Sequence, residues 1–146
     1  MSMNRLKKRF DFEITLLNNI ENIFVDECQD LNKGLEIFYF AKKYVMNIKL
    51  LFSKRYPFTP PNVKLISIED TDYIEFLCNV SCNFKDLSNE ECLCCNSIVC
   101  KNNWGPQKQL VDIIREIIKI TNNCEFEINK NIKKSIYLKY LGYTIT

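Results

Sequence analysis

The sequence predicts an α+β fold in which a small antiparallel sheet is flanked by helices. An early stretch has apolar residues at helical spacing, four β-type runs with short connections follow, and a second helical stretch comes after position 106. This order favours an N-terminal helix, a four-stranded antiparallel meander, an irregular active-site segment, a central helix and one shortened C-terminal helix. Because 146 residues suffice for one hydrophobic core, we expect residues 1–146 to form a single domain.

The first expected helix runs from Asn4 to about Leu17, before Asn18 and Asn19 break it. An apolar stripe recurs through it at steps of four, four and three: Leu6, Phe10, Ile14 and Leu17. Basic residues lie off that stripe, at Arg5, Lys8 and Arg9. Taken alone, they predict an ordinary solvated helix face.

Four strands are expected next, at residues 23–25, 35–40, 44–52 and 63–68. Short connections make an antiparallel meander the economical topology. From Glu69 to Lys101 neither the helical nor the strand period is visible. A long irregular segment inside a compact domain indicates a functional region, so we expect the site there.

Helical periodicity returns after Pro106. The central helix is predicted by an apolar stripe that ends at Asn122 and Asn123: Leu110, Ile113, Ile114, Ile117 and Ile118. A last, shortened helix is expected from Asn131 to Leu141, with Gly142 as its stop.

Composition and charge exclude several classes of protein. The net charge of +2 is too balanced to favour a nucleic-acid partner. No apolar run approaches the roughly 20 residues that a membrane-spanning helix needs, and the first residues lack the apolar core of a signal peptide. We therefore expect a cytoplasmic or nuclear protein without a membrane partner, and we take its eight cysteines as reduced thiols.

Two motifs carry the functional prediction. Tyr56-Pro57-Phe58-Thr59-Pro60-Pro61 has three prolines in five residues, which removes ladder donors and predicts a stiff exit from the sheet. The second motif is a cysteine-rich stretch that begins near Asn83, contains Cys92-Leu93 and ends at Trp104-Gly105-Pro106, which holds the only tryptophan. A reachable thiol with an amide donor upstream is the chemistry of a thioester-forming site.

The two motifs, in this order, resemble those of the ubiquitin-conjugating enzymes, and the resemblance runs from about Asn4 to Ile120. It implies the ubiquitin-conjugating fold and a protein that carries ubiquitin or a ubiquitin-like modifier as a thioester. It further implies transfer to a substrate lysine with a ligase, as a monomer and without a cofactor. The compact meander, the long gap between Cys92 and Trp104, and the run from Trp104 to Asp112 look most like the Nedd/Rub-type (neddylation) branch.

The resemblance also implies the catalytic residues. Cys92 is the expected nucleophile, chosen over Cys94 and Cys95 because only Cys92 is followed by leucine. Asn83 is expected to donate a hydrogen bond to the tetrahedral intermediate or to brace the loop that faces it. The alternative for Asn83 is a turn residue in an asparagine-rich chain.

Further residues match the binding surfaces of the family. Phe58 and Pro106 match positions of the ligase-docking surface, although Phe58 could instead anchor its loop in the core. Arg5 and Lys8 match the helix face that meets the activating enzyme. The expected partners are therefore a ubiquitin-type modifier, its activating enzyme and a ligase.

Departures from the family pattern leave two alternatives open. The chain has no histidine, so the family's His-Pro-Asn motif is reduced to Ser81-Cys82-Asn83, and the chain could be an inactive variant that binds a modifier or another partner. Several cysteines between positions 78 and 100 could instead hold zinc in an interaction domain. We expect no metal, because the Cys78–Cys82 and Cys92–Cys95 spacings do not repeat a zinc-knuckle geometry.

Overall fold

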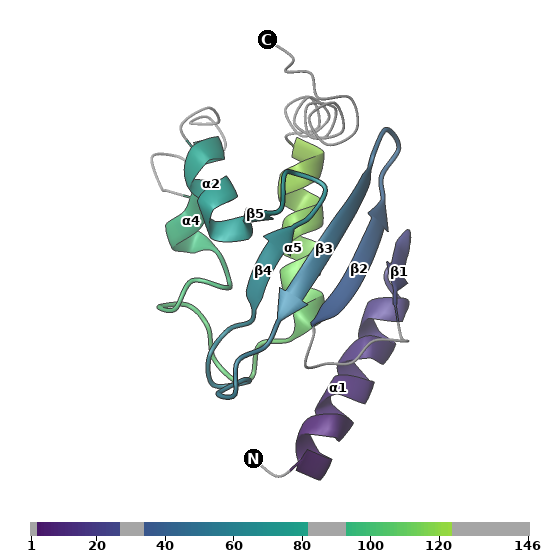
Figure 1. Cartoon of the computed structure of the whole chain (residues 1–146), viewed down its shortest axis with the longest axis vertical. Coiled ribbons are helices and arrows are strands. Elements are labelled where there is room, and N and C mark those ends of the chain that lie inside the picture. The colour runs from purple at the N-terminus through teal and green to yellow at the C-terminus, as the bar shows by residue number, and fades with distance from the viewer. Residues whose placement is uncertain (1–2, 27–33, 82–92, 124–146) are drawn as a thin grey trace.

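The structure is a computed structural model that describes residues 3–26, 34–81 and 93–123. It is an α+β fold with an N-terminal helix and a five-stranded antiparallel sheet (Figure 1). The elements in chain order are α1 (Met3–Asn18), β1 (Ile23–Val25), β2 (Leu35–Phe40), β3 (Val45–Leu51), β4 (Asn62–Leu65), β5 (Thr71–Asp72), α2 (Tyr73–Ser81), α4 (Leu93–Asn96) and α5 (Leu110–Asn123).

The sheet is the predicted antiparallel meander. Its strands follow the chain order from β1 to β5, and each strand pairs with the next. Side chains alternate between buried and more exposed positions along β2 and β3, as expected for strands with one face on the core. The strand ranges 23–25 and 35–40 are confirmed, and β3 is one residue shorter at each end than expected.

The prediction of four strands is wrong, because the sheet has five. The expected strand over residues 63–68 is replaced by β4, which ends at Leu65, and a tight turn follows. Glu69 and Asp70 lie in the left-handed backbone region, with φ of 53° and 55°. This reversal brings Thr71 back beside Leu65, where it begins β5.

The prediction that residues 69–101 are irregular is also wrong, because this stretch contains the helix α2. Asp72 caps the helix by accepting a hydrogen bond from the Glu75 backbone N–H at 3.3 Å. Tyr73, Phe76 and Leu77 are buried at helical spacing. The helix has only nine residues, so its period was too short to stand out in the sequence.

Helix α5 lies across one face of the sheet, and its apolar stripe forms the core with the inward side chains of the strands (Figure 1). The predicted central helix is confirmed, because Leu110, Ile113, Ile114 and Ile117 are fully buried. Helix α1 confirms the first predicted helix and packs against β1 and α5. The helix expected over residues 131–141 lies outside the described residues.

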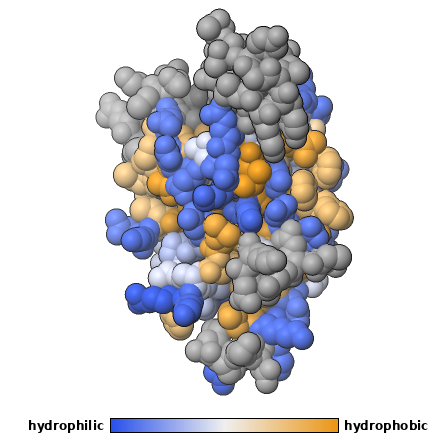
Figure 2. Space-filling view, viewed as in Figure 1, coloured by the Kyte–Doolittle hydropathy of each residue, from blue (hydrophilic) through white to orange (hydrophobic). Residues whose placement is uncertain are grey.

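The opposite face of the sheet is mostly hydrophilic over its middle, with apolar side chains toward the β1 edge (Figure 2). Glu36, Lys49 and Lys64 are neighbours across β2, β3 and β4 on this part of the sheet. Lys49 lies opposite Glu36, and Lys64 lies opposite Asp72 of β5, so each lysine has a carboxylate on an adjacent strand, which is stabilising. The proline-rich loop leaves from one end of the sheet, and the Trp104-Gly105-Pro106 turn lies just before α5 (Figure 1).

Candidate functional site

The proline-rich loop and the Trp-Gly-Pro turn form one structural unit, and they contain all four prolines of the chain. The Trp104 indole Nε1 donates a hydrogen bond to the Pro57 carbonyl oxygen at 2.8 Å. The Trp104 ring also lies against Tyr56, with centroids 6.4 Å apart, and the Tyr56–Pro57 peptide bond is cis. Two segments 47 positions apart in the chain are thereby joined.

This unit presents an apolar surface, which we call the platform and define as Phe58, Trp104 and Pro106, while Pro57 of the same unit is buried. Phe58 is 62% exposed, and Pro106 is exposed as well. The alternative in which Phe58 anchors the loop in the core is therefore wrong. Tyr56 fills that role instead, because it is buried and packs against the rings of Phe10 and Phe52.

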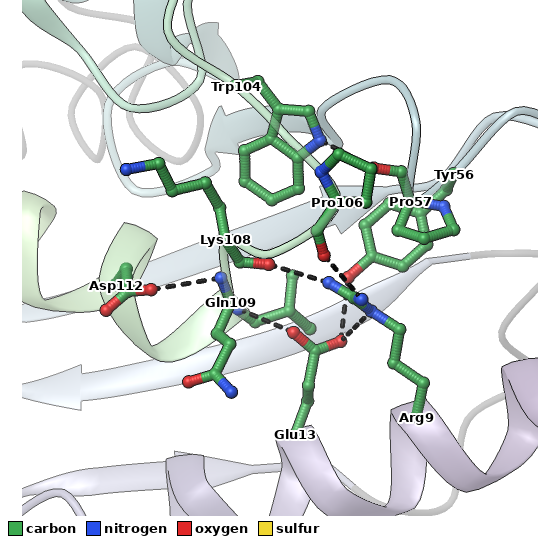
Figure 3. A network of polar contacts seen from close by, with 10 residues as sticks. Arg9, Glu13, Tyr56, Pro57, Trp104, Pro106, Lys108, Gln109 and Asp112 are labelled. Carbon is green, nitrogen blue, oxygen red and sulfur yellow. Dashed lines mark hydrogen bonds and ion pairs between the residues drawn. The ribbon is translucent and has the colours of Figure 1, made fainter.

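Two side chains of α1 hold the platform from below (Figure 3). The guanidinium of Arg9 donates to the Pro106 carbonyl oxygen from Nη1 and to the Lys108 carbonyl oxygen from Nη2, both at 2.7 Å. Arg9 also lies 3.4 Å from Glu13 as an ion pair and 5.4 Å from the centre of the Tyr56 ring. The prediction that Arg9 belongs to a solvated face is wrong, because its side chain is only 21% exposed.

Glu13 is the buried centre of this network, with 1% of its side chain exposed. One carboxylate oxygen accepts from the Tyr56 hydroxyl at 2.8 Å, and the other accepts from the Leu110 backbone N–H at 2.9 Å. Leu110 is the first residue of α5, so Glu13 places a negative charge at a helix N-terminus, where it is stabilising. Burial, with the nearby Glu13 carboxylate, raises the pKa of Tyr56 well above its ordinary value.

The start of α5 is further closed by its own residues. The Gln109 backbone N–H donates to the Asp112 carboxylate at 3.1 Å, in the manner of a capping box (Figure 3). The turn before α5 is therefore tied both to its own helix and, through Arg9 and Glu13, to α1. The platform sits on a rigid base made by two helices.

The second part of the site is the cysteine turn, which we define as residues 94–100. Cys94 is half-buried against the core, whereas Cys95 is exposed. The Asn103 side-chain amide donates to the Cys95 carbonyl oxygen at 2.8 Å and to the Ser97 carbonyl oxygen at 2.9 Å. The backbone that carries Cys95 is thus held in place from the segment that leads to Trp104.

Glu116 of α5 holds the cysteine turn from the other side. Its carboxylate accepts from the Ser97 hydroxyl at 2.8 Å and from the Ile98 backbone N–H at 3.0 Å. It also accepts from the Tyr73 hydroxyl of α2 at 2.8 Å. Burial, followed by the effect of the Glu116 charge, raises the pKa of Tyr73. One carboxylate therefore connects the cysteine turn, α2 and α5.

The residues predicted from sequence have different outcomes. Cys92 and Asn83, the expected nucleophile and donor, lie outside the described residues. Arg5 and Lys8 are exposed on α1, the same helix that supports the platform through Arg9. Phe58 and Pro106 lie in the two segments that the Trp104–Pro57 bond joins, and their role in ligase docking stays a prediction.

Sequence reasoning missed the two supporting carboxylates, Glu13 and Glu116. A local signal exists for Glu13, because it lies three residues after Phe10 and so borders the buried stripe of α1. An acidic residue there needs a buried partner, and Arg9 is one turn away. Glu116 similarly lies three residues after the stripe residue Ile113 and directly before Ile117 on α5.

Other kinds of site find little support in the part of the chain that the structure describes. Within it, no cluster of three or more His, Cys, Asp or Glu side chains is placed to hold a metal, and no helix is long and apolar enough to cross a membrane. Cys82 and Cys92 lie outside it, so the zinc alternative stays a prediction. A hollow of about 530 Å³ beside Phe40 and Asn122 contains none of the predicted site residues.

No model of a known protein family matches this chain, and no curated protein is significantly similar to it. The function must therefore be inferred from the residues and geometry of the chain itself.

Proposed function

We propose that this protein is a divergent ubiquitin-conjugating enzyme. It carries ubiquitin or a ubiquitin-like modifier as a thioester on Cys92 and passes it to a substrate lysine with the help of a ligase. The observation that carries the proposal is the platform, in which the Trp104 indole bonds the Pro57 carbonyl and leaves Phe58 exposed. In the family that the motifs resemble, these two segments form the surface on which the ligase docks.

The order of elements supports the same proposal. A helix, an antiparallel meander, a proline-rich exit loop, a cysteine segment, a Trp-Gly-Pro turn and a core helix follow one another as in that family. The cysteine turn begins two residues after Cys92 in the sequence and is held by Asn103 and Glu116. A well-held turn this close to Cys92 in the sequence favours a reproducible position for the acyl group.

The chemistry has two steps. The Cys92 thiolate attacks the acyl carbon of the modifier's C-terminus on the activating enzyme, a new C–S bond forms, and the activating enzyme's thiolate leaves. A substrate lysine amine then attacks the same carbon, a C–N bond forms, and the Cys92 thiolate leaves while the amine gives up a proton. Asn83 is the proposed donor to the oxyanion of this second step.

The first test is a charging reaction with activating enzyme, ATP and a panel of modifiers, followed by a non-reducing gel. We expect an adduct that reductant removes, with one modifier charged best. Cys92→Ala should abolish the adduct, and Cys92→Ser should give an ester that resists reductant. Cys94→Ala and Cys95→Ala are the matched controls and should charge normally.

Cys95 is the more informative control, because its thiol is exposed and its backbone is held by Asn103. Loss of the adduct in Cys95→Ala, with normal charging of Cys92→Ala, would show that the nucleophile is Cys95. Absence of any adduct with every modifier would refute the enzyme proposal.

The second candidate is an inactive variant that binds a modifier or another partner through the same surface. The observation that favours it is the complete absence of histidine, which removes the His-Pro-Asn motif. It predicts no adduct in the charging reaction but saturable binding of a ligase or modifier, lost in Phe58→Ala. The gel and a binding titration together separate the two candidates.

A further inference from the structure

Arg9 stands out because it makes two short bonds to the turn that carries Pro106. Both bonds are 2.7 Å long and run to backbone carbonyls, one of Pro106 and one of Lys108. Bonds from a charged donor are shorter and stronger than neutral ones, so this pair contributes more than ordinary side-chain contacts. Arg9 and Pro106 are 97 positions apart in the chain, so Arg9 makes a long-range connection.

Only an arginine can make this connection. Its planar guanidinium offers several N–H groups in a fixed fork, so it reaches two carbonyls at once, whereas lysine is a single point charge on a flexible stem. Arg9 is itself oriented by Glu13 at 3.4 Å and by the Tyr56 ring below the guanidinium. The Arg9 guanidinium is therefore oriented by contacts that do not involve the turn.

The Pro106 carbonyl belongs to one half of the platform, and Tyr56 belongs to the loop that carries Phe58 of the other half. The Pro106 carbonyl is held by Arg9, while the Tyr56 hydroxyl is held by Glu13 of the same helix. Helix α1 thus bonds both segments, the turn at Pro106 and the loop at Tyr56. The Trp104–Pro57 bond holds the turn at Trp104, whereas Arg9 holds it further along, at Pro106 and Lys108.

We propose that Arg9 is a positioning residue that sets the geometry of the docking platform. The part of this proposal that concerns ligase docking rests on the proposed function. The structural part does not, because it concerns only how Arg9 holds the turn that carries Trp104 and Pro106.

The chain offers a direct probe of the structural part, since Trp104 is its only tryptophan. We compare wild type, Arg9→Lys and the control Lys7→Ala, which changes an exposed cation of the same helix. Acrylamide quenching of Trp104 fluorescence should rise clearly in Arg9→Lys, with far-UV circular dichroism unchanged. The control should behave as wild type.

The docking part is tested by titrating a ligase domain that stimulates wild-type discharge. Losing one charge-assisted bond of about 1.4 kcal/mol corresponds to about a tenfold effect. Arg9→Lys should therefore need roughly tenfold more ligase for half-maximal discharge, with discharge to free lysine without ligase unchanged. A general structural defect would slow both reactions.

Each outcome decides the proposal. Quenching that stays at the wild-type level in Arg9→Lys would overturn it, because the turn would then be held without Arg9. Raised quenching with an unchanged ligase requirement would overturn the docking part. A wild-type chain that cannot be charged would refute the proposed function, and quenching would still decide whether Arg9 holds the turn.

Discussion

Replacing Glu116 by alanine should loosen the cysteine turn and lower the stability of the whole domain. The carboxylate accepts three hydrogen bonds, from Tyr73, Ser97 and Ile98, at 2.8–3.0 Å. Tyr73 and Ser97 are fully buried or nearly so, so water cannot replace the lost acceptor there. An unsatisfied buried donor typically costs about 1–3 kcal/mol.

The three costs do not simply add. The Tyr73 and Ser97 hydroxyls reach the same carboxylate oxygen, so in the variant they lie close enough to bond each other. We therefore expect Glu116→Ala to lose about 3–5 kcal/mol of the free energy of unfolding. In a chain of this size that lowers Tm by roughly 6–20 °C.

The assay is urea unfolding followed by circular dichroism, with two matched variants. Glu116→Gln keeps one acceptor oxygen for Ile98 and offers an amide that can donate to the hydroxyls, so it should lose only about 1–2 kcal/mol. Arg115→Ala changes an exposed neighbour on α5 and should stay within about 0.5 kcal/mol of wild type. A loss below 1 kcal/mol in Glu116→Ala would refute the bracing role.

Two further predictions follow from exposure and from titration. Phe58→Ala should leave the free energy of unfolding within about 0.5 kcal/mol of wild type, because the side chain is 62% exposed. The same variant should slow ligase-stimulated discharge by about tenfold or more. Unfolding of this variant in a thermal melt would contradict the assignment of Phe58 to an exposed docking surface. The raised pKa of Tyr73 means that the folded state keeps its proton after the unfolded chain, with an ordinary pKa near 10, has lost it. Stability should therefore be complete below about pH 10 and fall above it, with Tyr73 contributing up to about 1.4 kcal/mol per pH unit. Urea unfolding at pH 9 and pH 11 should show a shallower fall in Tyr73→Phe than in wild type, and an equal fall would be inconsistent with the buried phenol.

The fold was largely predictable because the core uses strong periodic patterns. The stripes of α1 and α5 and the alternation in β2 each extend over several residues, so they stand above chance. Helix α2 was missed because it is short, although Asp72 and Glu75 at its start are a recognisable capping pair. The turn at Glu69 and Asp70 was not predicted, because it contains no glycine to indicate its left-handed backbone.

The candidate site was predictable only in part, for a different reason. The proline-rich loop and the Trp-Gly-Pro turn are local motifs, and both were found in the sequence. Their connection depends on contacts such as Arg9 with Pro106, which join residues far apart in the chain. No local pattern contains that information, so Arg9 looked like any solvated cation.

The absence of histidine bears on whether such a site can be active. In the family that the motifs resemble, the histidine of His-Pro-Asn is mainly structural, so its loss matters only if nothing else holds the cysteine segment. Here Glu116 and Asn103 together make five hydrogen bonds to groups in and around the cysteine turn and α2. Residues 94–100 are therefore held by a carboxylate and an amide in a chain that has no imidazole. A Glu116→Ala protein that still folds but no longer charges would show that this brace supports the charging reaction in a chain without histidine.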